Sequence, residues 1–337
     1  MNESTAPVIT GEYKNRKTGL VIFGILTLLG GLCCALIIPL MFFAQAMATK
    51  TGGAQPSPLG IVPVIGIYGG LAVVGIWLGI GSILARRWAR AILLITSWFT
   101  LIIGIVMIIF MVFFFPHLME QINSSVMLST GKPSNLNPQM MWIIMGVMVV
   151  LLGFFFVVLP AAWVFFYRSR HVKATCEARN PAISWTDRCP LPVLAVSLMT
   201  GFSVISMLCM VFATHPLIPF FGIFLIGLKA RIIYLLCAIL FGYLAWAVYR
   251  LDLTGWWLML LVFCLFTLAK VITYARNDPM EIYRLMGLPT QSLAQIQMMN
   301  LFGKGWFLSI TLIWLVPVLG YLIYVKRFFG VAETKQP

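Results

Sequence analysis

The stretch PVLGYLIYVKR, from Pro317 to Arg327, has the same layout as PAAWVFFYRSR, from Pro160 to Arg170. In each stretch a proline lies in an apolar run, a tyrosine follows seven residues later, and basic residues come next. A tyrosine and bases at the end of an apolar run are typical of a helix that ends at a membrane surface. Because this ending recurs after about 157 residues, we expect the chain to consist of two related halves.

The composition is that of a membrane protein. Of the 337 residues, 61% are hydrophobic and only 9% are charged, and the mean hydropathy is +0.99. Soluble domains contain about 25% charged residues, so this chain has too few charges to cover its apolar surface in water. The bilayer must therefore surround most of the chain. The net charge of +14 does not indicate a nucleic-acid partner, because the bases cluster at the ends of apolar segments.

Eight apolar segments are long enough to cross a bilayer, which takes about 20 helical residues. We expect helices, since a helix satisfies its own backbone hydrogen bonds in lipid. The first run, Gly19–Phe43, is longer than the apolar core of a signal peptide, which has about 7–15 residues, so we expect it to be an uncleaved helix. The predicted spans are 19–44, 60–85, 89–115, 141–167, 191–214, 232–250, 255–274 and 306–325.

One further apolar stretch, PLIPFFGIFLIG at 216–227, is too short to cross the membrane. Three interpretations remain open, because the stretch could lie along the interface, extend a neighbouring helix or re-enter the membrane. Lys229 and Arg231 argue against a continuous pass into the next span.

The basic residues favour an orientation with both termini in the cytoplasm. In that orientation fifteen bases are cytoplasmic, seven are outside and Lys270 is within a span. The cytoplasmic bases are Lys14, Arg16, Lys17, Arg86, Arg87, Arg90, Arg168, Arg170, Lys173, Arg179, Arg188, Arg250, Lys326, Arg327 and Lys335, and the outer ones are Lys50, Lys132, Lys229, Arg231, Arg276, Arg284 and Lys304. We expect the chain to lie in the inner (cytoplasmic) membrane of a bacterium, with its bases against anionic lipid headgroups.

Other sequence anchors recur in the same order in the two halves. QMM at 139–141 returns at 297–299, and ARRWARAILL at 85–94 resembles YRLDLTGWWLMLL at 249–261. An even number of spans in each half makes the copies parallel, related by an axis along the membrane normal. The predicted fold is all-α, with eight transmembrane helices in two tandem parallel four-helix repeats. Its parts are a cytoplasmic tail (1–18), a first repeat (19–170), a cytoplasmic linker (171–190), a second repeat (191–327) and a cytoplasmic tail (328–337).

The sequence carries no specific catalytic or cofactor motif. None of its nine acids lies in a predicted span, whereas ion-coupled carriers commonly place carboxylates there. His171, Cys176 and Cys189 share the linker, but a structural zinc site needs four ligands at closer spacing. We therefore expect no enzymatic activity, no cofactor and no metal site.

Three charged residues are the candidate site. Glu120 and Glu281 each follow a methionine in the outer loops, 116–140 and 275–304, at matching places in the two halves. These loops could form a functional surface, or each Glu could stabilise the start of a short interfacial helix. Lys270 is the most intramembrane charge, and it could reach the outer interface or pair with an ion within the membrane.

These patterns favour a non-enzymatic structural or accessory membrane subunit. The alternative is a passive small-solute carrier or lipid-handling protein with a pathway between the repeats, and a membrane enzyme comes third. The expected partners are the lipid bilayer and either another membrane protein or further copies of the chain. Glycine motifs at 31–35, 66–70 and 75–81 are expected to let helices approach closely.

Overall fold

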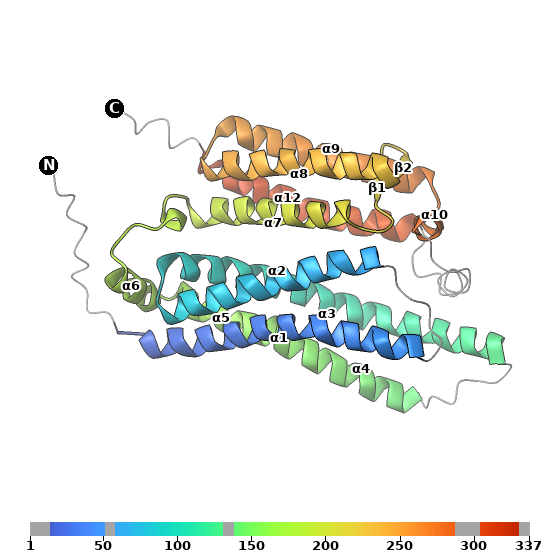
Figure 1. Cartoon of the computed structure of the whole chain (residues 1–337), viewed down its shortest axis with the longest axis horizontal. Coiled ribbons are helices and arrows are strands. Elements are labelled where there is room, and N and C mark those ends of the chain that lie inside the picture. The colour runs from blue at the N-terminus through green and yellow to red at the C-terminus, as the bar shows by residue number, and fades with distance from the viewer. Residues whose placement is uncertain (1–13, 51–57, 131–137, 287–303, 330–337) are drawn as a thin grey trace. The chain divides into compact units, whose positions relative to one another are not determined.

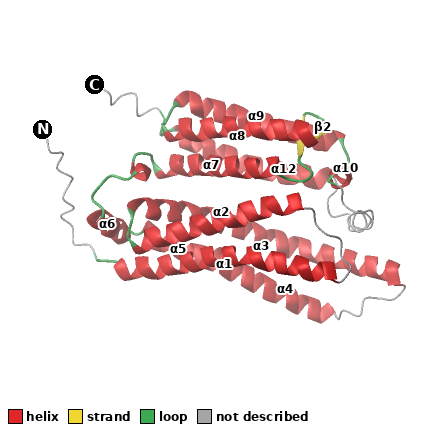
Figure 2. Ribbon diagram, in the orientation of Figure 1, coloured by secondary structure: helices red, strands yellow, loops and turns green. Residues whose placement is uncertain are grey.

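The computed structural model describes residues 14–50, 58–130, 138–286 and 304–329 (Figure 1). These residues are mostly helical (Figure 2). Seven of the described helices are long and apolar enough to cross a membrane, and the chain is an integral membrane protein. The seven candidate spans are Lys17–Met47, Val64–Ile83, Arg87–Phe113, Trp142–Arg168, Leu191–Val211, Gly227–Tyr249 and Leu253–Arg276.

The chain divides into two compact units. Unit 1 comprises Met1–Gln55, Tyr68–His117 and Asn135–Leu191, and unit 2 comprises Pro56–Ile67, Leu118–Ser134 and Pro192–Pro337. The elements of unit 1 are α1 (Lys17–Lys50), most of α2 (Pro58–Ile83) and α3 (Arg87–Thr130), α4 (Pro138–Gly153), the π-helix η1 (Phe154–Val158), α5 (Leu159–Arg168), α6 (Arg170–Arg179) and the 3-10 turn η2 (Trp185–Asp187).

Glycines bring the backbones of α1 and α2 into contact in unit 1. A Cβ atom on Gly31 would lie 2.8 Å from the amide nitrogen of Ile76, and one on Gly75 would lie 2.9 Å from the Cα of Gly31. Two turns along α1, a Cβ atom on Gly79 would lie 2.8 Å from the carbonyl oxygen of Gly24. Membrane helices pack closely at such small residues. The packing role predicted for Gly31, Gly75 and Gly79 is therefore confirmed. In the motif at 66–70, nothing lies within 4 Å of the Cβ position of Gly70, so the prediction is wrong for that residue.

Helices α4 and α5 form one span that is interrupted by the wide turn η1. Pro160 in α5 has no N–H group, and in a regular helix its ring would clash with the carbonyl four residues earlier, that of Phe156. The helix widens just before this proline, where the Leu159 amide donates to the carbonyl of Phe154, five residues back. Helix α3 packs tightly here, because a Cβ atom on Gly104 would overlap the carbonyl oxygen of Phe156.

Helix α3 is longer than the sequence predicted. We expected a span at 89–115 followed by an outer loop at 116–140, but α3 continues to Thr130. The prediction of a loop from residue 116 is wrong because Pro116 removes only one backbone hydrogen bond. The next residues, HLMEQINSSVM, contain no further proline or glycine that would end the helix.

Unit 2 is held together by polar contacts between its helices. Ser197 of α7 donates to the carbonyl of Ala245 in α8 at 2.7 Å. The indole nitrogen of Trp256 in α9 donates to the carbonyl of Leu322 in α12 at 3.0 Å. The elements of this unit are α7 (Leu191–Val211), β1 (Leu217–Phe220), β2 (Ile223–Ile226), α8 (Gly227–Tyr249), α9 (Leu253–Arg276), α10 (Pro279–Leu285) and α12 (Lys304–Lys326), with the ends of α2 and α3 that belong to it.

The stretch 216–227 folds as a β-hairpin, so the prediction of an all-α chain is wrong in this detail. Strands β1 and β2 are antiparallel, with Phe220 opposite Ile223. The two residues between the strands, Phe221 and Gly222, have φ angles of 41° and 99°, as a type I′ hairpin turn requires. Helix α8 begins at Gly227, directly after the hairpin, and not at residue 232 as predicted.

Candidate functional site

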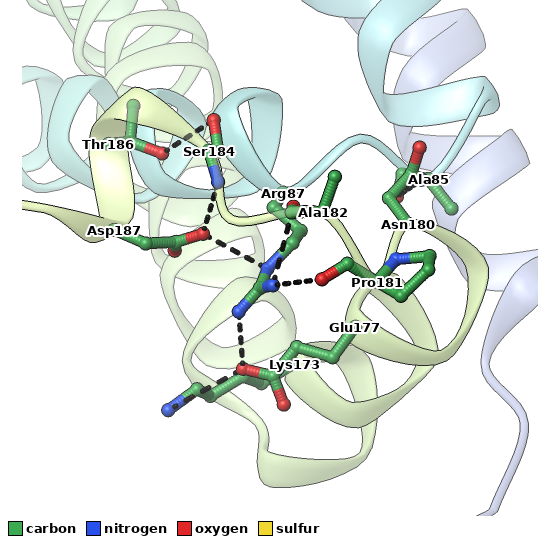
Figure 3. A network of polar contacts seen from close by, with 10 residues as sticks. All are labelled: Ala85, Arg87, Lys173, Glu177, Asn180, Pro181, Ala182, Ser184, Thr186 and Asp187. Carbon is green, nitrogen blue, oxygen red and sulfur yellow. Dashed lines mark hydrogen bonds and ion pairs between the residues drawn. The ribbon is translucent and has the colours of Figure 1, made fainter. Parts of the chain in front are cut away.

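The densest cluster of polar contacts in unit 1 surrounds Arg87, the first residue of α3 (Figure 3). Its Nε lies 3.0 Å from the Asp187 carboxylate, and its Nη2 lies 3.4 Å from the Glu177 carboxylate. A third contact joins Lys173 Nζ to Glu177 Oε1 at 3.8 Å. The Arg87 side chain is only 17% exposed. One guanidinium therefore connects α3, α6 and the segment that leads to α7.

The corner between α2 and α3 positions Arg87. Ala85 has a φ of 52°, and its amide donates to the Ser82 carbonyl while the Arg86 amide donates to the Gly81 carbonyl. This pattern is a Schellman motif, which ends a helix and turns the chain sharply. Asn180, just after α6, locks the corner, because its Nδ2 donates to the Ala85 carbonyl at 2.9 Å.

The segment after α6 is shaped by a capping box around η2. The Asp187 carboxylate accepts a hydrogen bond from the Ser184 amide at 3.0 Å, and the Ser184 side chain interacts with the backbone of Asp187 in return. The same carboxylate pairs with Arg87. Asp187 thus stabilises both its own turn and the start of α3. Its place three residues after Ser184 is the spacing of a capping box.

A second, more deeply buried set of contacts lies about one helical turn further along α3, where Arg90 meets Tyr167. The hydroxyls of Tyr167 and Ser82 are 2.7 Å apart, and Ser82 donates to the carbonyl of Leu20. Arg90 Nε donates to the carbonyl of Tyr167 at 3.1 Å. Tyr167 is fully buried, and its hydroxyl joins α5 to α1 and α2 through Ser82. The tyrosine lies in the last turn of α5, next to Arg168, so a buried hydrogen bond holds the helix end that the sequence predicted at the membrane surface.

The linker cysteines are buried side chains. Cys176 and Cys189 are 1% and 4% exposed. Burial raises the pKa of the Cys176 thiol to about 11 and that of Cys189 also to about 11. A thiol with such a pKa is almost wholly protonated near neutral pH, and the thiolate is the nucleophile and metal ligand. Among the described residues, no three His, Cys, Asp or Glu side chains gather at one point.

A small open pocket lies at the α2–α3 corner, and we call it the corner pocket. Its volume is about 180 Å³. Two arginines, an amide and a hydroxyl provide its polar lining, and a tryptophan ring and two aliphatic side chains provide the rest. The lining residues are Arg86, Arg87, Trp88, Asn180, Ala182, Ile183 and Ser184.

The three charged residues singled out in the sequence do not form one site. Glu120 lies within helix α3, and its side chain is outside the described part of the structure. Of the two interpretations of Glu120, the one at the start of a short helix is therefore wrong, because α3 is continuous through this residue. Glu281 lies exposed in the first turn of α10, behind the cap formed by Asp278. Lys270 lies exposed on α9, and no hydrogen bond or ion pair joins these two described side chains.

Sequence reasoning missed the Arg87 cluster because its members lie far apart in the chain. Arg87 and Glu177 are separated by 90 positions, and nothing local marks them as partners. One signal was present, because Glu177 and Asp187 are the only acids between Glu120 and Asp252 and both lie in the base-rich linker. Acids among many bases are expected to find a basic partner.

Comparisons of the chain with protein-family models, curated proteins and solved structures find no match.

Proposed function

We propose that this chain is a non-enzymatic integral membrane protein, a structural or accessory subunit. The observation that carries the proposal is that the ion-pair network around Arg87 in unit 1 is neutral, because Arg87 and Lys173 balance the two carboxylates. Arg87 is paired with both Glu177 and Asp187, and its remaining nitrogen donates to backbone carbonyls. Charges arranged in this way stabilise a fold and leave no free acid–base pair for catalysis.

The proposed architecture is eight transmembrane helices in two tandem parallel repeats, with α12 as the eighth. Support comes from the corners between the second and third helices of the halves. In α8–α9, Leu251 has a φ of 61°, its amide donates to the carbonyl of Val248, and the Asp252 amide donates to that of Ala247. This is the same Schellman motif, with the same offsets, as at the α2–α3 corner.

A pair of small residues closes each of these corners. A Cβ atom on Gly81 would lie 2.7 Å from the Cβ of Ala89, and a Cβ atom on Gly255 would lie 2.6 Å from the Cβ of Ala247. The glycine and the alanine have exchanged places, but the contact is at the same position. In an experimental structure we expect the halves to superimpose about an axis along the membrane normal. Superposition only about an axis in the membrane plane contradicts the repeat.

The proposed orientation has both termini in the cytoplasm of a bacterium, with the chain in the inner membrane. The distribution of bases supports it. Bases occur at four places in unit 1, which are the start of α1, the α2–α3 corner, the end of α5 and α6. Hydrogen bonds connect these places, because the Arg16 amide donates to Thr175 and Arg86 donates to Asn180.

The accessory role is tested in the host cell. A photo-crosslinking residue is placed at outward-facing positions of α1, such as Leu36, which is 66% exposed. We expect one discrete crosslinked membrane protein, and we expect the abundance of that protein to fall when the gene for this chain is deleted. If no partner is found, and the purified chain in liposomes passes small solutes or scrambles lipid, the carrier alternative replaces this proposal.

A further inference from the structure

The corner pocket carries an unbalanced positive charge. Arg86 is exposed, and its described polar contact is to the neutral amide of Asn180 at 3.0 Å. Arg87 and Lys173 together balance the carboxylates of Glu177 and Asp187, so the charge of Arg86 is the one left over. A guanidinium is well suited to bind a phosphate, because its N–H groups match the spacing of the phosphate oxygens.

The surroundings of the pocket increase this positive field. We define the basic end of unit 1 as residues 14–17, 84–90 and 167–189. It contains eleven bases and two acids. The bases are Lys14, Arg16, Lys17, Arg86, Arg87, Arg90, Arg168, Arg170, Lys173, Arg179 and Arg188, and the acids are Glu177 and Asp187. An anionic ligand is therefore favoured over a zwitterionic one.

The apolar side of the pocket points to a lipid. Trp88 lines the pocket, and its ring stacks on that of Trp77 at a centroid distance of 4.0 Å. Trp77 on α2 is 49% exposed, Leu84 just after α2 is 53% exposed, and Ile183 at the pocket is 71% exposed. Bases and an exposed apolar surface thus meet at the point where the candidate span Val64–Ile83 ends. A free phosphate ion would use only the polar half of this arrangement.

The size of the pocket fits a headgroup. A volume of about 180 Å³ is well above the roughly 10–15 Å³ that one water molecule needs. The pocket is open to its surroundings, so a phosphate group can enter it while the acyl chains stay outside. We propose that the corner pocket binds the phosphate of an anionic phospholipid, with Arg86 on the phosphate and the acyl chains along Trp77 and Leu84. The proposal does not depend on the accessory role of the chain.

Native mass spectrometry of the delipidated full chain in detergent tests the proposal. The chain is mixed with equal amounts of phosphatidylglycerol and phosphatidylcholine. We expect the first bound lipid to be phosphatidylglycerol. Arg86→Gln should lower its apparent affinity about tenfold, because a charge-assisted hydrogen bond is lost. The matched control Arg168→Gln changes the net charge equally at an exposed base of the same end, and we expect less than a twofold effect (about 0.4 kcal/mol).

A second variant covers the case in which Arg86→Gln loosens the fold by losing its bond to Asn180. Ile183→Asp places a carboxylate at the pocket without removing any of these hydrogen bonds, and we expect the same loss of phosphatidylglycerol. Three results overturn the proposal. They are equal losses in Arg86→Gln and Arg168→Gln, equal binding of phosphatidylcholine, and displacement of the lipid by a large excess of inorganic phosphate, which identifies a free-phosphate site.

Discussion

Single residues in unit 1 connect segments that the sequence keeps far apart. Arg87 joins α3 to two acids of the linker, and Asn180 ties the linker to the α2–α3 corner. Tyr167 does the same inside the bundle, through its hydroxyl to Ser82 and its carbonyl to Arg90. A few polar side chains therefore set the geometry of a helix end whose other contacts are non-directional and apolar.

Removing Arg87 should destabilise unit 1. In Arg87→Ala the carboxylates of Glu177 and Asp187 lose their shared partner. Their side chains are 22% and 32% exposed, so water compensates only in part, and we expect a loss of about 2 kcal/mol in the free energy of unfolding. Thermal unfolding in detergent measures the loss. Arg170→Ala, at an exposed base of α6, is the control, and an equal melting temperature for both variants contradicts the role of the cluster.

The linker thiols should react slowly until the pH is high. With pKa values of about 11 for Cys176 and Cys189, only about a thousandth of each is thiolate at pH 8, and the fraction rises tenfold with each pH unit up to the pKa. Iodoacetamide labelling followed by peptide mass spectrometry should show slow alkylation in the folded chain and fast alkylation after denaturation. Equal alkylation rates for the folded and the denatured chain at pH 8 contradict this prediction.

At the scale of the element, backbone contact between helices is decided by which glycines face a neighbour. Gly31 meets the backbone of α2, whereas nothing lies within 4 Å of the Cβ position of Gly30. In unit 2, hydrogen bonds hold the tip of the β1–β2 hairpin against α9. The Thr273 hydroxyl of α9 accepts from the Gly222 amide at 2.9 Å, and Asn277 donates to the Gly222 carbonyl at 2.9 Å.

The two adjacent glycines of α1 offer a matched comparison. In Gly31→Ala the new methyl group would meet the Ile76 nitrogen at 2.8 Å and the Ala72 carbonyl oxygen at 3.0 Å. We expect the helices to separate, at a cost of about 1–3 kcal/mol. Gly30→Ala adds the same methyl group to open space and improves helix propensity, so its stability should be unchanged or higher. Thermal unfolding of the two variants measures the difference. An equal loss of stability in both variants contradicts the packing role of Gly31.

The hairpin should depend on one buried hydroxyl. Thr273 is fully buried, and Thr273→Val keeps its shape but leaves the Gly222 amide without its acceptor. We expect a loss of about 1–2 kcal/mol and faster hydrogen exchange across β1 and β2. Thr267→Val is the control, since that hydroxyl bonds only to the Phe263 carbonyl of its own helix. Unchanged exchange in the hairpin after Thr273→Val shows that the hydroxyl does not hold it.

At the scale of the whole molecule, the sequence predicted the helices well because their signal is local. A run of about 20 apolar residues reveals a span wherever it occurs. The hairpin was missed because Phe221, a bulky residue with positive φ, hides the turn in an apolar run. The Arg87 cluster was missed because pairing across 90 residues is set by packing. Glu120 and Glu281 were grouped by their sequence context, and that context does not determine where α3 ends.

The predicted orientation can be tested on the intact chain. Single cysteines in an otherwise cysteine-free chain are placed at Ser134, Thr290 and Ser169. We expect an impermeant thiol reagent to label the first two from outside intact cells and to label the third only after permeabilisation. Ser134 and Thr290 lie outside the described residues, so the test uses only their place in the sequence. Labelling of Ser169 in intact cells, with protection of Ser134, reverses the topology.

The wide turn η1 before Pro160 also sets how the side chains of α4 are rotated about the helix axis relative to those of α5. A π-turn contains one residue more than an α-turn, and one residue corresponds to about 100° of rotation. The stripe of α4 that faces its neighbours is therefore not the continuation of the stripe on α5. A single deletion within Phe154–Val158 would turn every side chain of α4 by about that angle relative to α5, and would therefore change which of them face lipid. These five residues therefore determine which side chains of α4 and of α5 lie on the same side of the span.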